Sequence, residues 1–174
     1  MANHKSYLFT SARLGFRNWL ATDLEEMAAI NADKAVMEFF PKVATKEETL
    51  NFIHRMQQQL TNKGFCYFAV DLLESHEFIG FIGLFEQTYE AHFTPCVDIG
   101  WRLRKTAWNQ GFATEGAARC LEYAFQDLNL QKVVAVAPKI NVRSEQVMKK
   151  IGMKKSGEFE HPLLGDCERL RDCV

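Results

Sequence analysis

The segment from Trp108 to Glu115 constrains the fold of this chain more than any other stretch. A strand-like run at residues 97–103 precedes it, and a helix-like run continues to about residue 128. In such a loop the backbone N–H groups point outward, and the N-terminus of the helix carries roughly half a positive charge. Gly111 lets the backbone come close to a ligand. The pattern therefore favours a site for phosphate or pyrophosphate. The alternative is that the loop only connects the strand to the helix and binds no ligand.

A second pattern lies downstream of this loop. An apolar run at residues 133–138 predicts a buried strand, and an Asn-x-x-Ser step at 141–144, a helix and a Gly-Met pair at 152–153 follow. This order of elements resembles that of the GNAT acetyltransferases, and within them the RimJ/RimL-like group of ribosomal-protein N-terminal acetyltransferases. The phosphate loop of the family reads Gln/Arg-x-x-Gly-x-Gly/Ala, and Trp108, Gly111 and Ala113 stand at those positions.

The resemblance extends over nearly the whole chain and implies an α/β fold. We expect the GNAT fold, with a mixed, mostly antiparallel central sheet that is splayed between two central strands and has helices on both faces. Residues 1–174 are expected to form a single GNAT acetyltransferase domain.

Composition excludes several classes of function. The chain has 174 residues, of which 47% are hydrophobic, and its 21 basic and 22 acidic residues give a net charge of −1. That balance favours neither nucleic acid nor a membrane surface as a partner. The five cysteines form no C-x-x-C pair and no clear cluster with histidine, so we expect no metal and reduced thiols. Without an apolar run of 18 residues or an export signal, a cytoplasmic location is expected.

The remaining elements are predicted from periodicity and capping patterns. Thr22-x-x-Glu25 and Thr45-x-x-Glu48 are capping boxes that each predict a helix, the second ending near Gly64. Residues 65–73 and 77–85 predict a hairpin. Further strands are expected at residues 11–19, 132–137, 154–159 and 170–174, and a short helix at 144–151.

The resemblance implies how acetyl-CoA is held. The backbone N–H groups of the loop are expected to bind the pyrophosphate. The pantetheine arm is expected to pair with the exposed strand edge, where a backbone N–H also serves as the oxyanion donor. Trp108 either shields the cofactor or packs in the core. The loop residues are Asn109, Gln110, Gly111, Phe112, Ala113 and Thr114, and the edge residues are Trp101, Arg102 and Leu103.

A proton donor for the leaving thiolate is the next requirement. Many GNAT enzymes use a tyrosine in the helix after the Asn-x-x-Ser step, but Met148 stands there and has no proton to give. The ribosomal subgroup is thought to use the serine of the step, which is Ser144 here. The alternative is that Ser144 is an N-cap. By resemblance Asn141 binds the pantetheine arm, and otherwise it is a turn residue.

The general base and the acceptor pocket have several candidates. Asp98 matches a strand position where some GNAT enzymes carry a catalytic glutamate, but it also suits a surface or ion-paired aspartate. Glu115 is a second candidate, although acids in a first helical turn often serve the helix dipole. Phe39 and Phe40, in a connector that otherwise anchors the core, and His161, in a late loop, are expected to border the acceptor pocket.

The predicted function is acetyl transfer from acetyl-CoA, as co-substrate, to an amine. An α-amine has a pKa of about 7.7–8.0 and a lysine amine one of about 10.4, so a weak base suits a peptide or protein N-terminus better. A ribosomal protein is the expected acceptor. A small-molecule amine and a catalytically silent acyl-CoA-binding module are the alternatives. We expect a monomer or a homodimer.

Overall fold

The computed structural model describes residues 6–174, and within them a five-stranded antiparallel sheet runs in the order β1-β2-β3-β4-β5. Each strand therefore pairs with its neighbour in the sequence. The turn between β3 and β4 contains His76 at a φ of +57°, and it forms the hairpin that the sequence predicts. The strands are β1 (Phe9–Thr10), β2 (Leu14–Arg17), β3 (Tyr67–Leu72), β4 (Phe78–Gln87) and β5 (Cys96–Leu103).

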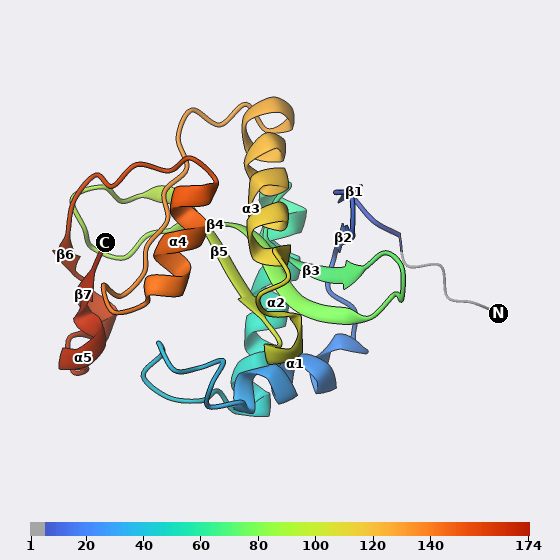
Figure 1. The fold of residues 1–174 in the computed structure, drawn as a ribbon, viewed down its shortest axis with the longest axis horizontal. Coiled ribbons are helices and arrows are strands. Elements are labelled where there is room, and N and C mark those ends of the chain that lie inside the picture. The colour runs from blue at the N-terminus through green and yellow to red at the C-terminus, as the bar shows by residue number, and fades with distance from the viewer. Residues whose placement is uncertain (1–5) are drawn as a thin grey trace.

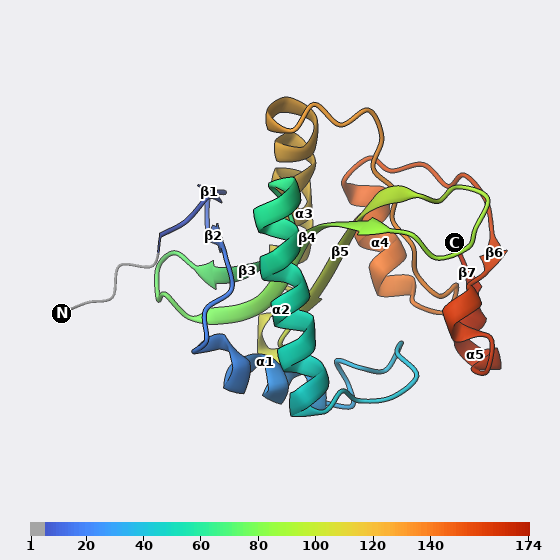
Figure 2. The ribbon, with the colours of Figure 1, turned by 180° about the vertical axis from the view of Figure 1, so that it is seen from behind.

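Helices cover both faces of this sheet, as predicted. The helices α1 (Asp23–Ala32) and α2 (Lys46–Lys63) lie on one face, and α3 (Phe112–Glu122) lies on the other (Figures 1 and 2). The helix α4 (Val142–Lys150) is on the same side as α3 and contacts it. The sheet thus separates the connector between α1 and α2 from the loop that opens α3.

The two predicted capping boxes have different outcomes. At α2 the Thr45 hydroxyl accepts a hydrogen bond from the Glu48 N–H, and the Glu48 carboxylate accepts one from the Thr45 N–H, so this box is confirmed. At α1 the predicted helix is present, but the Thr22 side chain makes no capping bond, so the capping box itself is wrong. Asp23 instead accepts from the Leu20 N–H at 2.7 Å and fixes the turn that leads into the helix.

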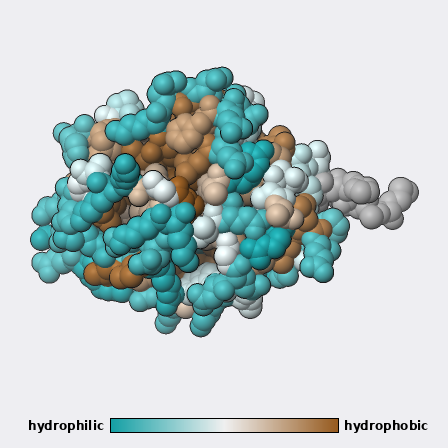
Figure 3. Space-filling model, turned by 45° about the horizontal axis from the view of Figure 1, so that its top comes forward, coloured by the Kyte–Doolittle hydropathy of each residue, from teal (hydrophilic) through white to brown (hydrophobic). Residues whose placement is uncertain are grey.

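The core lies between the helices and the sheet. The helix α3 comes close to the sheet because Gly116 has no side chain, and a Cβ there would lie 2.3 Å from Cδ1 of Ile82. On the face shown in Figure 3, hydrophilic side chains cover most of the surface, and apolar ones gather in a hollow between them.

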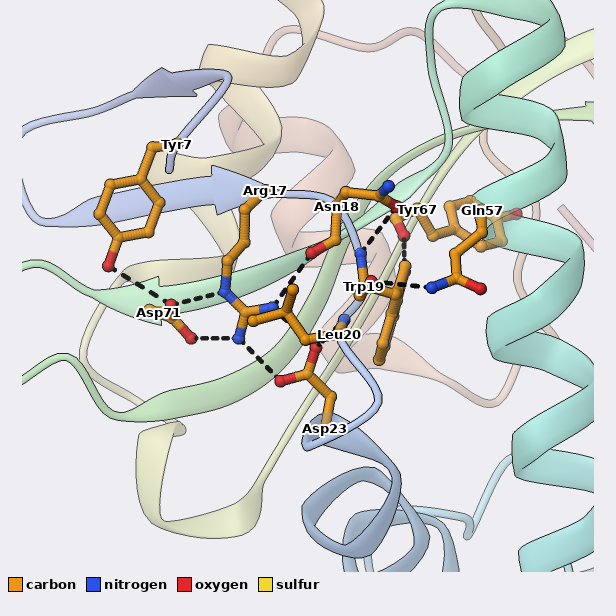
Figure 4. A network of polar contacts seen from close by, with 9 residues as sticks. All are labelled: Tyr7, Arg17, Asn18, Trp19, Leu20, Asp23, Gln57, Tyr67 and Asp71. Atoms are coloured by element: carbon orange, nitrogen blue, oxygen red, sulfur yellow. Dashed lines mark hydrogen bonds and ion pairs between the residues drawn. The ribbon is translucent and has the colours of Figure 1, made fainter. Parts of the chain in front are cut away.

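A buried charge network holds β2, β3 and α1 together (Figure 4). The Arg17 guanidinium is 1% exposed and donates to both oxygens of Asp71 at 2.7 and 2.8 Å and to both oxygens of Asp23 at 2.7 and 2.9 Å. These charge-assisted pairs satisfy the cation from two sides. The network is structural, since none of its three side chains lines the cavity described below.

The predicted strand at residues 132–137 is present only as an isolated bridge, so its predicted length is wrong. Val134 forms a single parallel bridge with Asp98, through bonds from Ile99 N to Val134 O at 2.8 Å and from Val134 N to Val97 O at 3.0 Å. Beyond it the segment leaves β5, and Ala137 exchanges two backbone bonds with Val174 instead. This divergence is the splay that the resemblance implies.

The C-terminal region also departs from the sequence prediction. Instead of strands over 154–159 and 170–174, the structure has a short pair, β6 (Phe159–Glu160) with β7 (Asp172–Cys173), and a turn of helix, α5 (Glu168–Arg171). The predicted first strand is likewise shorter, because only residues 14–17 pair as β2. The segments β6 and β7 lie apart from the five-stranded sheet in Figure 1, and β7 is paired with β6 alone as a strand.

Within residues 6–174 no helix is long and apolar enough to cross a membrane. The same residues contain no group of three or more His, Cys, Asp or Glu side chains placed to hold a metal ion. The expectation about an export signal bears partly on residues 1–5, which lie outside the described residues.

Candidate active site

A cavity of about 830 Å³ opens where β5 and the segment at 133–138 separate. Its walls come from β5, the loop before α3, the start of α4, the connector after α1 and the loop after β6. The predicted site residues that line it are Phe39, Phe40, Asp98, Trp101, Arg102, Leu103, Trp108, Asn109, Gly111, Phe112, Ala113, Thr114, Asn141, Ser144 and His161. Gln110 is not among the lining residues, and its side-chain amide donates to the Thr106 carbonyl at 2.8 Å.

The loop before α3 presents backbone N–H groups. Asn109 and Gly111 have positive φ angles of +60° and +81°, which turn the chain sharply into the helix. Gly111 is the N-cap and has no side chain to satisfy the first N–H groups of α3. Ala113 and Thr114, in that first turn, line the cavity. Free N–H groups at a helix N-terminus form an anion site.

A cationic side chain from α4 reinforces this end of the cavity. Arg143 lies over the ring of Trp108, with its guanidinium carbon 5.0 Å from the ring centroid. Lys150, at the opposite end of α4, lines another part of the cavity wall. The Trp108 indole N–H donates to the Leu103 carbonyl at 2.8 Å. Trp108 therefore packs against β5 and also lines the cavity, and its role in shielding the cofactor stays a prediction.

The start of α4 corrects the capping role considered for Ser144. The helix begins at Val142, two residues earlier than predicted, and the Asn141 side chain accepts from the Ser144 N–H at 3.1 Å. Asn141 is thus the N-cap, and Ser144 is in the first turn of the helix. Ser144 and Met148 both line the cavity, and only Ser144 of these two carries a transferable proton.

Asp98 lies at the point where the splay begins. It is 9% exposed, and its two oxygens accept from the Tyr67 hydroxyl at 2.6 Å and the Gln87 amide at 3.0 Å. The alternative of a surface or ion-paired aspartate is wrong, because these partners are neutral and the residue is buried. Burial raises the pKa of Asp98 to about 6, although both hydrogen bonds act to lower it.

Glu115, the other candidate base, is used elsewhere. Its carboxylate accepts from the Ser11 hydroxyl at 2.7 Å and from the Nε and backbone N of Arg13 at 2.7 and 2.8 Å. Burial acts to raise its pKa, but these bonds outweigh it and lower the pKa below the usual value. Glu115 is absent from the cavity lining and ties α3 to the loop before β2.

The Arg102 side chain is a feature that sequence reasoning missed, since only its backbone was assigned a role. Its guanidinium carbon lies 4.1 Å from the ring centroid of Phe40 and 5.3 Å from that of Phe81. Nη1 donates to the Asn31 side-chain oxygen at 2.7 Å, whereas the buried Nε has no hydrogen-bond partner. Burial lowers the pKa of Arg102 to about 10, so it stays charged at neutral pH.

The connector after α1 anchors the core and also lines the cavity, and its role in acceptor binding stays a prediction. Val36 and Met37 are buried and anchor it, whereas Phe40 is 40% exposed and faces the cavity with Phe39.

His161 is half-buried in the opposite wall rather than merely exposed. Its Nδ1 accepts from the Leu163 N–H at 3.2 Å, which leaves the proton of the neutral ring on Nε2. Its ring lies 4.4 Å from that of Tyr89, and burial lowers its pKa. A neutral His161 therefore borders the cavity from the loop after β6.

Comparison with known proteins shows the family and the fold of this chain. Residues 13–154 match the family model described as an acetyltransferase (GNAT) domain. An uncharacterized N-acetyltransferase, YnaD of Bacillus subtilis (strain 168), is 32% identical over 156 residues, which are 87% of this chain and 85% of that protein. A GNAT-family acetyltransferase from Bacillus anthracis superposes with a TM-score of 0.78 at 27% identity, over 94% of this chain and 93% of that one.

A more distant solved structure is also similar in fold. Spermidine N-acetyltransferase from Vibrio cholerae, solved in complex with CoA and spermine, has a TM-score of 0.68 at 20% identity, over 85% of each chain.

Proposed function

This chain belongs to the GNAT acetyltransferase family, and we propose that it transfers the acetyl group of acetyl-CoA to the α-amine of a peptide or protein, such as a ribosomal protein. The observation that carries the proposal is one cavity that joins an anion-binding loop to a buried carboxylate, Asp98. These are the two ends of an acetyl-transfer site, one for the phosphates of coenzyme A and one for the proton of the amine.

The cavity fits coenzyme A at its cationic end. The N–H groups of residues 109–114 are offered to the pyrophosphate, and Arg143, which lies over the ring of Trp108, adds positive charge nearby. The splay leaves the β5 edge open beyond Ile99, whose N–H is taken by Val134. Hydrogen-bonding groups repeat every second residue along a strand, so the Trp101 N–H points to the same edge. We assign it to the pantetheine arm or to the thioester oxygen.

The chain supplies the proton transfers. Acetyl-CoA brings a thioester, which an amine attacks at its carbonyl carbon. With a pKa of about 6, Asp98 is mostly ionised above pH 7 and accepts the proton that the attacking amine releases, directly or through water. The Ser144 hydroxyl lies across the cavity and is assigned to the leaving sulfur. Because a thiol has a solution pKa near ~8.5, this donor assists the reaction without being indispensable.

An α-amine suits this base better than a lysine side chain. At pH 7.5 roughly a third of α-amines are neutral, against about one lysine amine in a thousand. A single buried carboxylate with neutral partners is a modest base, so an acceptor that is already partly deprotonated needs less from it. Small amines with depressed pKa values meet the same condition.

The proposal is tested by the release of free coenzyme A from acetyl-CoA across a panel of amines. The panel contains ribosomal-protein N-terminal peptides, amino acids, polyamines and aminoglycosides, and we expect turnover with peptides above the rate of hydrolysis. Calorimetry with coenzyme A runs beside it. Tight binding without turnover on any amine would overturn the transferase and favour a silent acyl-CoA-binding module, an alternative that Met148 in the tyrosine position motivates.

A further inference from the structure

Arg17 is fully buried and Arg102 is partly buried, and the two arginines differ in how their charges are compensated. Arg17 donates four hydrogen bonds to the carboxylates of Asp23 and Asp71, so its charge is neutralised within the fold (Figure 4). Arg102 has no carboxylate partner among residues 6–174, and its one hydrogen-bond acceptor is the neutral amide of Asn31. A buried cation is costly unless it is paired. An unpaired cation that faces a cavity is therefore unlike the structural pair at Arg17.

The neighbours of Arg102 hold it in position without neutralising it. Phe40 and Phe81 lie against the guanidinium, and Asn31 fixes Nη1. Asn31 is itself held, because its amide donates to the Thr49 hydroxyl at 2.9 Å. A guanidinium has five N–H donors in a fixed plane that matches a carboxylate, and here Nε is among those left without a partner.

Arg102 also lies on the same face of the sheet as the proposed base. Side chains alternate along a strand, so Asp98, Gly100 and Arg102 share the face that Tyr67 and Phe81 cover. The α-carbons of Asp98 and Arg102 are about 13 Å apart, at roughly 3.3 Å per residue. The anion-binding loop is at the start of α3, on the other face, so Arg102 is on the acceptor side.

We propose that Arg102 binds a carboxylate of the acceptor, so that the substrate is an amine that also carries a carboxylate. The inference rests on the proposed function. The carboxylate belongs either to an acidic side chain near a peptide N-terminus or to the main-chain acid of an amino acid. Polyamines are disfavoured as acceptors, because they would place cations against the cationic Arg102. Among residues 6–174 the other charged side chains that line the cavity are Arg143, Lys150 and Asp98, so the lining has more basic than acidic groups.

The test measures binding without turnover. Two matched pairs of acetylated products are titrated by calorimetry into the complex with coenzyme A. One pair is N-acetyl-Ala-Asp-amide and N-acetyl-Ala-Asn-amide, and the other is N-acetylalanine and N-acetylalaninamide, so that each pair isolates one source of carboxylate. We expect the acid to bind about tenfold more tightly or better in one pair. Equal binding of acid and amide in both pairs would overturn the proposal.

The variants assign the preference to Arg102. Arg102→Met should abolish the difference between acid and amide, and Arg102→Lys, which keeps the charge but loses the planar fork, should reduce it severalfold. Arg104→Met is the matched control, since Arg104 pairs with Glu26 and Glu77 outside the cavity, and it should keep the full preference. A preference that survives in Arg102→Met would overturn the assignment.

Two further outcomes separate the inference from the proposed function. If Arg102→Met does not fold, as thermal melting will show, the lysine variant decides, and an undiminished preference in it refutes the role of the planar fork. In the other outcome, the wild type binds the acid more tightly and loses this preference in Arg102→Met, yet acetylates no amine. That outcome would support the carboxylate site and refute the proposed transferase activity.

Discussion

At the scale of single residues, Asp98 is the proposed general base, and burial changes the pKa of its carboxyl. Tyr67 and Gln87 are neutral donors that hold it, and burial outweighs them, so its pKa rises from the usual 3.8 to about 6. A base with this pKa is mostly ionised in neutral solution and binds a proton more tightly than an ordinary aspartate. The same burial makes Asp98 a cost to stability.

Asp98→Asn should separate function from stability. We expect turnover to fall about 10²-fold in this variant. In the wild type, kcat/KM should decrease as the pH falls through about 6, and in the variant this pH dependence should be absent. Because the raised pKa favours the protonated form in the folded state, wild-type stability falls as pH rises from 4 through 6. The neutral variant should lack this decline in stability between pH 4 and 6, although it keeps only one of the two side-chain oxygens that accept from Tyr67 and Gln87. Urea unfolding and a pH–rate profile measure the two effects.

Tyr67→Phe is the companion to this variant. Removing the hydroxyl that donates to Asp98 should raise the pKa of the carboxyl further, so the acidic limb of the profile should move to higher pH. If the acidic limb keeps its midpoint in Tyr67→Phe and is still present in Asp98→Asn, the group that titrates in it is not Asp98 but another group, such as the substrate amine.

Ser144 and Asn141 offer a second comparison at the same scale. Because Asn141 is the cap, Ser144→Ala should cost little stability but lower turnover about 10²-fold if its hydroxyl is the general acid. Asn141→Ala should cost about 1 kcal/mol through loss of the cap. Melting curves and steady-state kinetics on both variants decide the roles. Unchanged turnover in Ser144→Ala would remove it from the catalytic set.

At the scale of elements, the loop that opens α3 is the proposed anchor for coenzyme A. Gly111→Glu should abolish binding in calorimetry, since a carboxylate would stand where phosphate oxygens are placed. Gly152→Glu is the matched control, because Gly152 has a similar φ of +83°, carries the same backbone strain when substituted, and does not line the cavity. Equal affinity in the two folded variants would refute the loop assignment.

Local sequence signals predict some elements better than others. The capping box of α2, the β3–β4 hairpin and the loop before α3 are set by neighbouring residues, and the structure confirms them. The segment at 132–137 has the apolar residues of a strand, but its extent depends on whether β5 stays beside it. Divergence after Val134 is a tertiary property, and so are the C-terminal pairings that replace the predicted strands.

The candidate site follows the same division. Spacing in the chain points to the loop, Asn141 and Asp98, because these positions belong to a recognisable order of elements. The role of the Arg102 side chain could not be predicted from the sequence, because it depends on the absence of a carboxylate partner among residues 6–174. That absence depends on α1, β4 and the connector at Phe40, which come together only in the fold.

At the scale of the whole molecule, charge is distributed unevenly. The chain carries a net charge of −1, yet among residues 6–174 the cavity lining contains Arg102, Arg143 and Lys150 and a single acid, Asp98. A cavity with this balance attracts anionic ligands. The sheet divides the cavity into the side that we propose for the phosphates and the side that we propose for the acceptor, and the two sides meet where β5 is splayed.

The central claim is acetyl transfer to an α-amine, and one measurement tests it most directly. A ribosomal-protein N-terminal peptide that contains one lysine and one acidic residue is incubated with the protein and acetyl-CoA, and mass spectrometry of fragments locates the acetyl group. The account predicts one acetyl group on the α-nitrogen. Acetyl groups on the lysine nitrogen alone, or none with coenzyme A bound, would contradict it.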